Sequence, residues 1–178
     1  MTRQAADQRS GVVIGWPPAF DDFYRTEYGP VVGLVYSLSG SRWAAEDLAQ
    51  EAFLRAHRDW DRVGAFEHPA GWVRRVAINL AMSRLRRLAA ETRALRRFTG
   101  GSPVAFPPPE PESDRFWSAV RSLPRRQAQV VALFYLEDRS VAQIAEVLDI
   151  ADSAVKTALL KWRRNLETRL ANSNGRTS

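Results

Sequence analysis

The chain has 178 residues, 45% hydrophobic and 26% charged, which is enough apolar material for a globular core. It has no cysteine, which excludes disulfides, thiolate zinc sites and cysteine nucleophiles, and its two histidines, His57 and His68, have no metal-ligand spacing. We therefore expect no metal, no cofactor and no catalytic residue. The N-terminal residues lack a signal-peptide core and no apolar stretch could span a bilayer, so the sequence predicts a soluble, cytoplasmic protein without membrane insertion.

Basic residues outnumber acidic ones by 26 to 20, and all but two of the basic residues are arginines. The excess lies in residues 1–98 and 114–178, whereas the charged residues of 99–113 are all acidic. A basic surface favours polyanions, because each neutralised phosphate releases condensed counterions. Many soluble proteins carry such a charge, so nucleic acid is at this point one candidate partner among others.

Residues 99–113 divide the chain into two blocks. This segment is rich in proline, contains two adjacent glycines and has no helical period, which is typical of an extended linker. No stretch of the chain alternates as a strand does, so the sequence predicts an all-α protein. We expect two small helical domains, residues 16–98 and 114–171, joined by the Pro-rich linker at 99–113.

Apolar spacing, breaks and capping residues place seven helices along the chain. Those of the first block are expected at residues 20–38, 42–59 and 69–98, with a break at 39–41 and a loop at 61–68. Those of the second block are expected at residues 114–123, 125–136, 141–148 and 152–170, the last two capped by Ser140 and Asp152. The short turn between the last two helices makes them a helix-turn-helix candidate.

The helix expected at 42–59 has one apolar and one polar face. The expected inward residues are Ala45, Leu48, Ala49, Ala52, Phe53 and Ala56. The expected outward residues include Asp47, Gln50, Glu51 and Arg55. An acidic surface in a basic chain favours a second, basic protein partner, although an ordinary amphipathic helix has the same pattern.

The helix that begins at Pro69 places polar and basic side chains in one narrow arc, at about 100° per residue. The arc contains Arg75, Asn79, Met82, Ser83 and Arg86. Apolar residues take the opposite side, namely Val73, Val76, Ala77, Leu80, Ala81 and Leu88. Amide and hydroxyl groups between arginines suit contacts with bases and phosphates. The alternative is that this face of the helix is only exposed to solvent, above all at Arg93, Arg96 and Arg97.

The last helix combines a core stripe with a basic face. Its apolar stripe consists of Val155, Leu159, Trp162, Leu166 and Leu170. The other side carries Lys156, Thr157, Leu160, Lys161, Arg163 and Arg164. Short donors near the N-terminus followed by cations are typical of a DNA recognition helix, although a bundle helix with solvated cations has the same pattern.

Several motifs in a fixed order resemble the extracytoplasmic-function (ECF) sigma factors. Residues 47–56 (DLAQEAFLRA) and 72–87 (WVRRVAINLAMSRLRR) are similar to region 2 of that family. Five further segments resemble region 4 of the same family: residues 121–125 (RSLPR), 130–137 (VVALFYLE), 140–148, 155–157 and 163–164. The resemblance covers nearly all of residues 20–170.

The resemblance implies a promoter-specificity subunit of bacterial RNA polymerase, with no enzymatic activity of its own. Residues implied to bind the clamp helices of the largest polymerase subunit are Asp47, Gln50, Glu51 and Arg55. Those implied to read the −10 element are Trp60, Phe66, Arg75, Asn79, Ser83, Arg86 and Arg87. Those implied to read the −35 element are Lys156, Thr157, Leu160, Lys161, Arg163 and Arg164. Core RNA polymerase and promoter DNA would be the partners. The resemblance leaves open whether an anti-sigma factor is a further partner.

Alternatives stay open at this point. Trp60 and Phe66 would either stack on unpaired bases or fill the space between helices, whereas Trp162 is expected in the core. The sequence departs from the family at Ile78, Ser83, Ala154 and Ala158, so the promoter sequence cannot be transferred from relatives. A stand-alone helix-turn-helix regulator would explain only the second block. A second alternative, from a different class of protein, is a helical adaptor whose basic faces bind acidic proteins.

Overall fold

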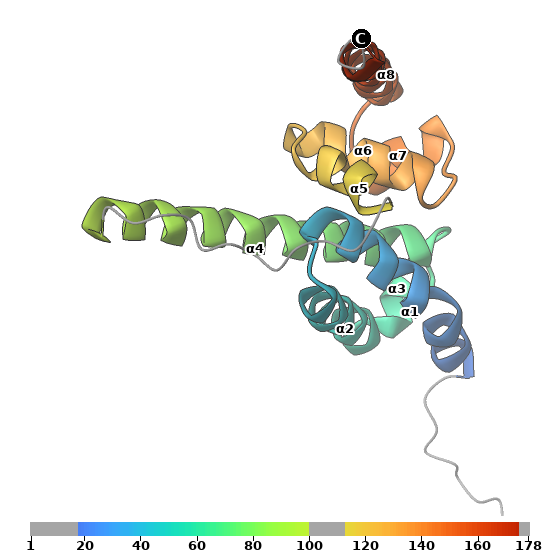
Figure 1. The fold of residues 1–178 in the computed structure, drawn as a ribbon. Helices are drawn as coiled ribbons and strands as arrows, with labels where there is room; N and C mark the ends of the chain where they lie inside the picture. Colours follow the sequence, from blue (N-terminus) through green and yellow to red (C-terminus); the bar gives the residue numbers. More distant parts are fainter. Residues whose placement is uncertain (1–17, 100–112, 175–178) are drawn as a thin grey trace, which may run out of the picture.

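The computed structural model describes residues 18–99 and 113–174, so almost all of the predicted linker lies outside the described residues. Within these ranges all regular secondary structure is helical, without strands, which confirms the all-α prediction (Figure 1). The helices are α1 (Pro18–Ser39), α2 (Arg42–Arg58), α3 (Trp60–Val63), α4 (Pro69–Thr99), α5 (Ser113–Arg121), α6 (Arg125–Tyr135), α7 (Val141–Leu148) and α8 (Asp152–Asn174).

The helix ends follow local sequence signals in most places. Ser41 caps α2 by accepting a hydrogen bond from the backbone N–H of Ala44, and Ser140 forms a capping box with Gln143 at the start of α7. Asp152, predicted as a cap, is instead the first residue of α8, where its charge favours the positive end of the helix dipole.

The segment at 61–68 was expected to be a loop, but α3 occupies its first part. One helical turn places Val63 in the core and lets the Trp60 ring pack against Phe20 and Phe23, at centroid distances of 4.9 and 5.0 Å. Residues three positions apart share one side of a helix, so this turn buries two side chains that an extended loop would separate. The prediction of a continuous loop was therefore wrong.

Helices α1 to α4 form the first domain. The predicted inward residues of α2 are all buried: Ala45, Leu48, Ala49, Ala52, Phe53 and Ala56. Four of these six are alanines, so the backbone of α2 can approach its neighbours closely. Phe53 projects from this face into an aromatic cluster with Phe23, Tyr24 and Tyr28 of α1.

Helices α5 to α8 form the second domain, with α7 and α8 as its helix-turn-helix. Asp149 between them adopts a left-handed conformation with a φ of 55°, which turns the chain sharply after α7. The predicted core positions Val155, Leu159 and Trp162 are buried. Leu166 and Leu170 lie outside the described side chains.

The two domains pack directly on one another. Helices α5 and α6 contact α1, and α7 contacts α4, so that the buried residues of both domains form one continuous cluster. Figure 1 shows the second half of α4 running away from the rest of the molecule. Leu88, predicted on the apolar side of α4, is therefore 40% exposed, because none of the other described helices covers this part.

Candidate nucleic-acid and protein interfaces

The polar face of α2 stands on the surface as predicted. Asp47, Gln50 and Arg55 are exposed, and Glu51 is partly exposed and accepts a hydrogen bond of 2.8 Å from Arg55 Nε. Leu54 was missed by sequence reasoning, yet its side chain is 50% exposed on the same face. Its position four residues after Gln50 is the signal that would have found it.

An apolar hollow of about 310 Å³ adjoins this face. Its lining residues come from α1 and α2: Phe20, Asp21, Tyr24, Gln50, Phe53, Leu54 and His57. Burial, and then the nearby Tyr28, raise the pKa of the Tyr24 phenol, so its hydroxyl adds no charge to the hollow at neutral pH. A hollow with an apolar rim beside exposed carboxylates suits a protein partner with a large apolar side chain and basic neighbours.

The predicted arc on α4 divides into three parts. Asn79, Ser83 and Arg86 are exposed, and so is Arg87, the further −10 candidate beside the arc. Met82, predicted in the same arc, is buried; α4 packs against α1, α2 and α7, so its buried face is wider than one stripe. Arg75 is partly exposed but already engaged, and Ile78 is buried.

Arg75 bonds to the second domain. Its Nε donates to the carbonyl oxygen of Val147 at 2.9 Å, and its Nη2 donates to the carbonyl oxygen of Glu146. The carboxylate of Asp149 lies 3.9 Å from Nη1. A residue expected to contact DNA therefore has two of its donors committed to the C-terminal end of α7.

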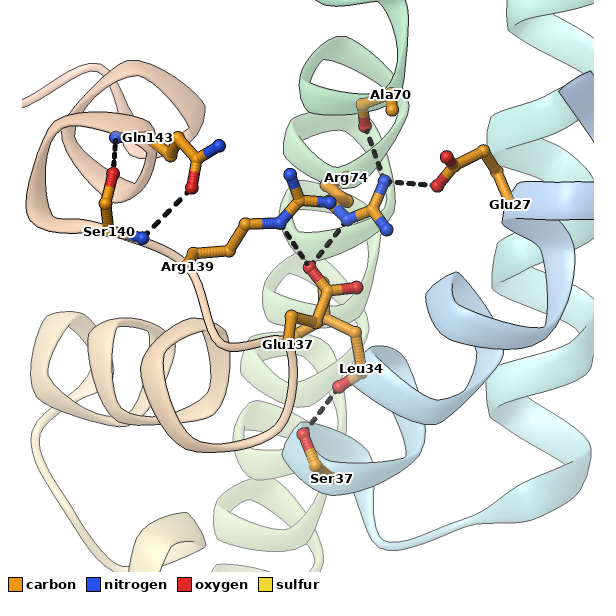
Figure 2. Close-up of polar contacts among 9 residues, drawn as sticks. All are labelled: Glu27, Leu34, Ser37, Ala70, Arg74, Glu137, Arg139, Ser140 and Gln143. Atoms are coloured by element: carbon orange, nitrogen blue, oxygen red, sulfur yellow. Dashed lines mark hydrogen bonds and ion pairs between the residues drawn. The ribbon is translucent and has the colours of Figure 1, made fainter.

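The neighbouring Arg74 is the residue that sequence reasoning missed most completely. Its side chain is 3% exposed and lies between Glu27 of α1 and Glu137 (Figure 2), at 2.7 and 2.6 Å. Burial acts to lower the pKa of Arg74, but the hydrogen bonds and charges of these carboxylates outweigh it, and the pKa lies above its ordinary value. No local signal separates Arg74 from Arg75, because both carboxylate partners are distant in the sequence.

The two aromatic candidates for base capture have different surroundings. Trp60 is partly buried and packs against Phe20 and Phe23. Phe66, between α3 and α4, is 39% exposed, and among residues 18–99 and 113–174 no aromatic ring stacks on it. Of the two rings, Phe66 is the more accessible to an unpaired base.

The predicted recognition face of α8 is fully on the surface. Its exposed side chains are Lys156, Thr157, Leu160, Lys161, Arg163 and Arg164. The hydroxyl of Thr157 donates to the carbonyl of Ser153 at 2.8 Å, which leaves its oxygen lone pairs available as acceptors. Trp162 is buried on the opposite side, which confirms its predicted core position.

Comparison with known proteins assigns both domains. Residues 23–91 match the family Sigma-70 region 2, and residues 113–166 match Sigma-70, region 4. The ECF RNA polymerase sigma factor SigW of Bacillus subtilis is 29% identical over 166 residues, which cover 85% of this chain and 89% of SigW. The ECF RNA polymerase sigma factor SigE of Mycolicibacterium smegmatis is 30% identical over 170 residues, which cover 90% of this chain and 65% of SigE.

A solved structure has the same fold. The sigma factor RpoE of Bartonella quintana, in complex with the anti-sigma factor NepR, superposes with a TM-score of 0.66 at 21% identity, covering 86% of this chain and 97% of RpoE. The chain belongs to the ECF RNA polymerase sigma factors, a family that is not a known enzyme class. Among the described residues, no helix is both long and apolar enough to cross a membrane, and no group of His, Asp and Glu could hold a metal ion.

Proposed function

We propose that three exposed helical faces divide the work of promoter-specific transcription initiation. The face of α2 binds the clamp helices of core RNA polymerase, α4 with the segment before it reads the −10 element, and α8 reads the −35 element. This proposal rests on one observation: the polar faces of α2, α4 and α8 each lie opposite a buried apolar face, in a chain that belongs to the sigma-factor family. The domains are residues 16–98 and 114–171, joined by 99–113; the chain acts in the cytoplasm and is not an enzyme.

Promoter opening would use Phe66 and Asn79 together. An exposed aromatic ring supports an unpaired base by stacking, which contributes about 1–3 kcal/mol per base. The amide of Asn79 offers a donor and an acceptor for one base edge. Arg86 and Arg87 follow on the exposed side of α4, where their cations suit the phosphate backbone.

Duplex recognition would use the first turns of α8. Lys156 and Thr157 lie close to its start at Asp152, the part of a recognition helix that enters the major groove. Lys161 and Arg164 continue the Thr157 face further along the helix and would hold the backbone. Val155 and Leu159 are buried on the opposite side and fix the rotation of α8 against its domain.

Reversing the charge of the α2 face should abolish binding to the polymerase. In the double variant Asp47→Lys/Glu51→Lys, two acceptors become cations, so basic partner groups would be repelled. We expect that the variant no longer co-purifies with core RNA polymerase, while its helical circular-dichroism spectrum is unchanged.

Glu91→Lys is the matched control for this experiment. Glu91 is exposed on the far part of α4, so this charge reversal should leave co-purification at the wild-type level. A folded Asp47→Lys/Glu51→Lys variant that binds core as wild type does would show that the α2 face is only solvated.

Two alanine variants of α4 should separate base reading from phosphate binding. Asn79→Ala should change the preferred −10 bases, whereas Arg86→Ala should weaken open-complex formation about equally on all promoters. Both side chains are exposed, so each substitution should change the free energy of unfolding by no more than about 0.5 kcal/mol, as surface substitutions usually do, and the melting temperature should hardly move. The measurement is open-complex formation by holoenzyme on templates that differ only in the −10 element. If Asn79→Ala leaves both yield and base preference unchanged, Asn79 does not read DNA.

An anti-sigma factor is part of the proposed set of partners. The RpoE structure shows the same fold in complex with NepR, which its description gives as an anti-sigma factor. A regulator of this kind for the present chain should compete with core polymerase, so adding it should lower co-purification with core.

A further inference from the structure

Trp43 is the most exposed large apolar residue in the described part of the chain. It is 68% exposed at the start of α2, although its neighbours Ala44 and Ala45 are buried. The other tryptophans in residues 18–99 and 113–174 are buried or partly buried: Trp60, Trp72, Trp117 and Trp162. Trp43 belongs neither to the core nor to the residues proposed above to bind DNA or polymerase.

Trp43 lies on the same side of α2 as the proposed polymerase-binding residues. Positions 43, 47, 50 and 54 are separated by four, three and four residues, and at about 100° per residue they fall within an arc of about 60°. All four side chains are exposed, and we call them the α2 stripe: Trp43, Asp47, Gln50 and Leu54. This is the spacing of the residues through which two helices pack in a coiled coil.

The α2 stripe is apolar at both ends and polar in the middle. Trp43 and Leu54 are separated by about 16 Å along the helix, at a rise of about 1.5 Å per residue. Between them, Asp47 offers a carboxylate and Gln50 offers an amide. A helix that packs along this stripe should therefore have an apolar side chain near each end and a basic side chain between them.

Arg84 of α4 positions the Trp43 ring. Its Cζ lies 5.4 Å from the ring centroid, within the range of a cation–π interaction. A guanidinium over the ring restricts the conformations of Trp43 while the ring remains largely exposed. A side chain that is already held in place loses less conformational entropy when a partner binds. The contact with Arg84 therefore prepares Trp43 for binding.

The Trp43 ring lies away from the proposed DNA surfaces. On α4, Arg84 is rotated by about 140–180° from Arg75, Asn79 and Arg86. Helix α2 contacts α1 and α4 and lies on their far side from the second domain, to which α8 belongs (Figure 1). DNA bound at the −10 and −35 surfaces would therefore leave Trp43 accessible to a protein.

We propose that core RNA polymerase packs an α-helix along the whole α2 stripe, with Trp43 as a second apolar anchor in addition to Leu54. This inference rests on the proposed function of the α2 face, which it extends by one turn toward the start of the helix. Core polymerase is the partner because Trp43 continues that face without a break. Tryptophan is among the residues that contribute most to binding when a pocket of the partner encloses its ring.

The affinity for core RNA polymerase tests the second anchor. The full-length chain is titrated with core polymerase of the source bacterium, in the absence of DNA, to obtain Kd. Trp43→Ala should raise Kd about tenfold or more, whereas Trp43→Phe, which keeps an aromatic ring, should stay within about threefold of wild type. Tyr36→Ala is the matched control, because it removes a 42% exposed ring from α1 and should bind as wild type does. Thermal melting should be unchanged in all three variants.

Arg84→Gln tests how the ring is positioned. Loss of the cation should raise Kd about two- to fivefold, as expected for an exposed cation–π interaction, and Arg84→Lys should restore most of the affinity. In the Trp43→Ala background the same change should have no further effect, because two residues in contact are not additive. An equal effect in both backgrounds would show that Arg84 does not act through Trp43.

A photo-crosslink identifies what the residue at position 43 contacts. The photoreactive amino acid p-benzoylphenylalanine replaces Trp43 in the full-length chain, and the complex with core polymerase is irradiated with and without genomic DNA fragments. We expect a crosslink to the largest polymerase subunit in both samples. A crosslink to DNA in its place, or none to core polymerase, would overturn the inference.

Failure of this inference differs from failure of the proposed function. If Trp43→Ala binds core as tightly as wild type while Asp47→Lys/Glu51→Lys does not bind, the polymerase contacts the middle of α2 and Trp43 is not an anchor. If the wild-type chain itself does not bind core, the proposed function of α2 is wrong, and the role of Trp43 is wrong with it.

Discussion

Replacing Phe53 with alanine should lower the free energy of unfolding by about 3–5 kcal/mol, the usual cost of removing a buried aromatic side chain. Phe53 is 2% exposed and contacts the rings of Phe23, Tyr24 and Tyr28. The other inward residues of α2 are mostly alanines, whose short side chains do not reach into the space that the ring would leave. Thermal and urea melting of the full chain, followed by circular dichroism, measures the loss.

Leu54→Ala is the matched control, one position further along α2. Leu54 is half-exposed beside the α2 hollow, so its truncation should leave stability within about 0.5 kcal/mol of wild type. It should instead reduce co-purification with core polymerase, because the proposed interface loses its apolar rim. A stable Phe53→Ala together with an unstable Leu54→Ala would mean that α2 is rotated relative to the structure described above.

Leu159→Ala should cost about 2–5 kcal/mol in the stability of the second domain. Leu159 is buried on the face of α8 that also holds Val155 and Trp162, so the truncated side chain leaves a cavity between α8 and its neighbours. DNA binding should fall only as a consequence of the lost fold. The melting temperature of the full-length variant gives the measurement, and lower temperature should restore −35-dependent transcription in part.

Lys156→Ala should show the opposite behaviour. Lys156 is exposed three residues before Leu159, so the melting temperature should not change. Losing one base-edge contact costs about 1–3 kcal/mol, which corresponds to roughly a five- to 150-fold loss of affinity. Transcription from templates with matched and altered −35 elements measures the loss of selectivity. An unstable Lys156→Ala with a fully stable Leu159→Ala would require the DNA contacts of α8 to be reassigned.

Periodicity in the sequence was sufficient to predict which faces of α2 and α8 are buried. Residues three and four apart share a side of a helix, so Leu48 and Ala52, or Val155 and Leu159, indicate the inward direction without knowledge of the partner. The same reasoning failed on α4, where Met82 is buried and Leu88 is half-exposed. How much of α4 is covered depends on α1, α2 and α7, and the periodicity of one helix does not contain that information.

The sequence by itself determined the helical class, the helix cap at Ser140 and the basic face of α8, because each follows from neighbours within a few residues. Only the tertiary structure decided the roles of Arg74 and Arg75. These adjacent arginines look alike in the sequence, yet one is buried between Glu27 and Glu137 and the other bonds to the end of α7. Their partners lie 47, 63 and 72 residues away, and such contacts exist only where packing brings distant segments of the chain together, within the first domain for Glu27 and between the domains for Glu137 and Val147.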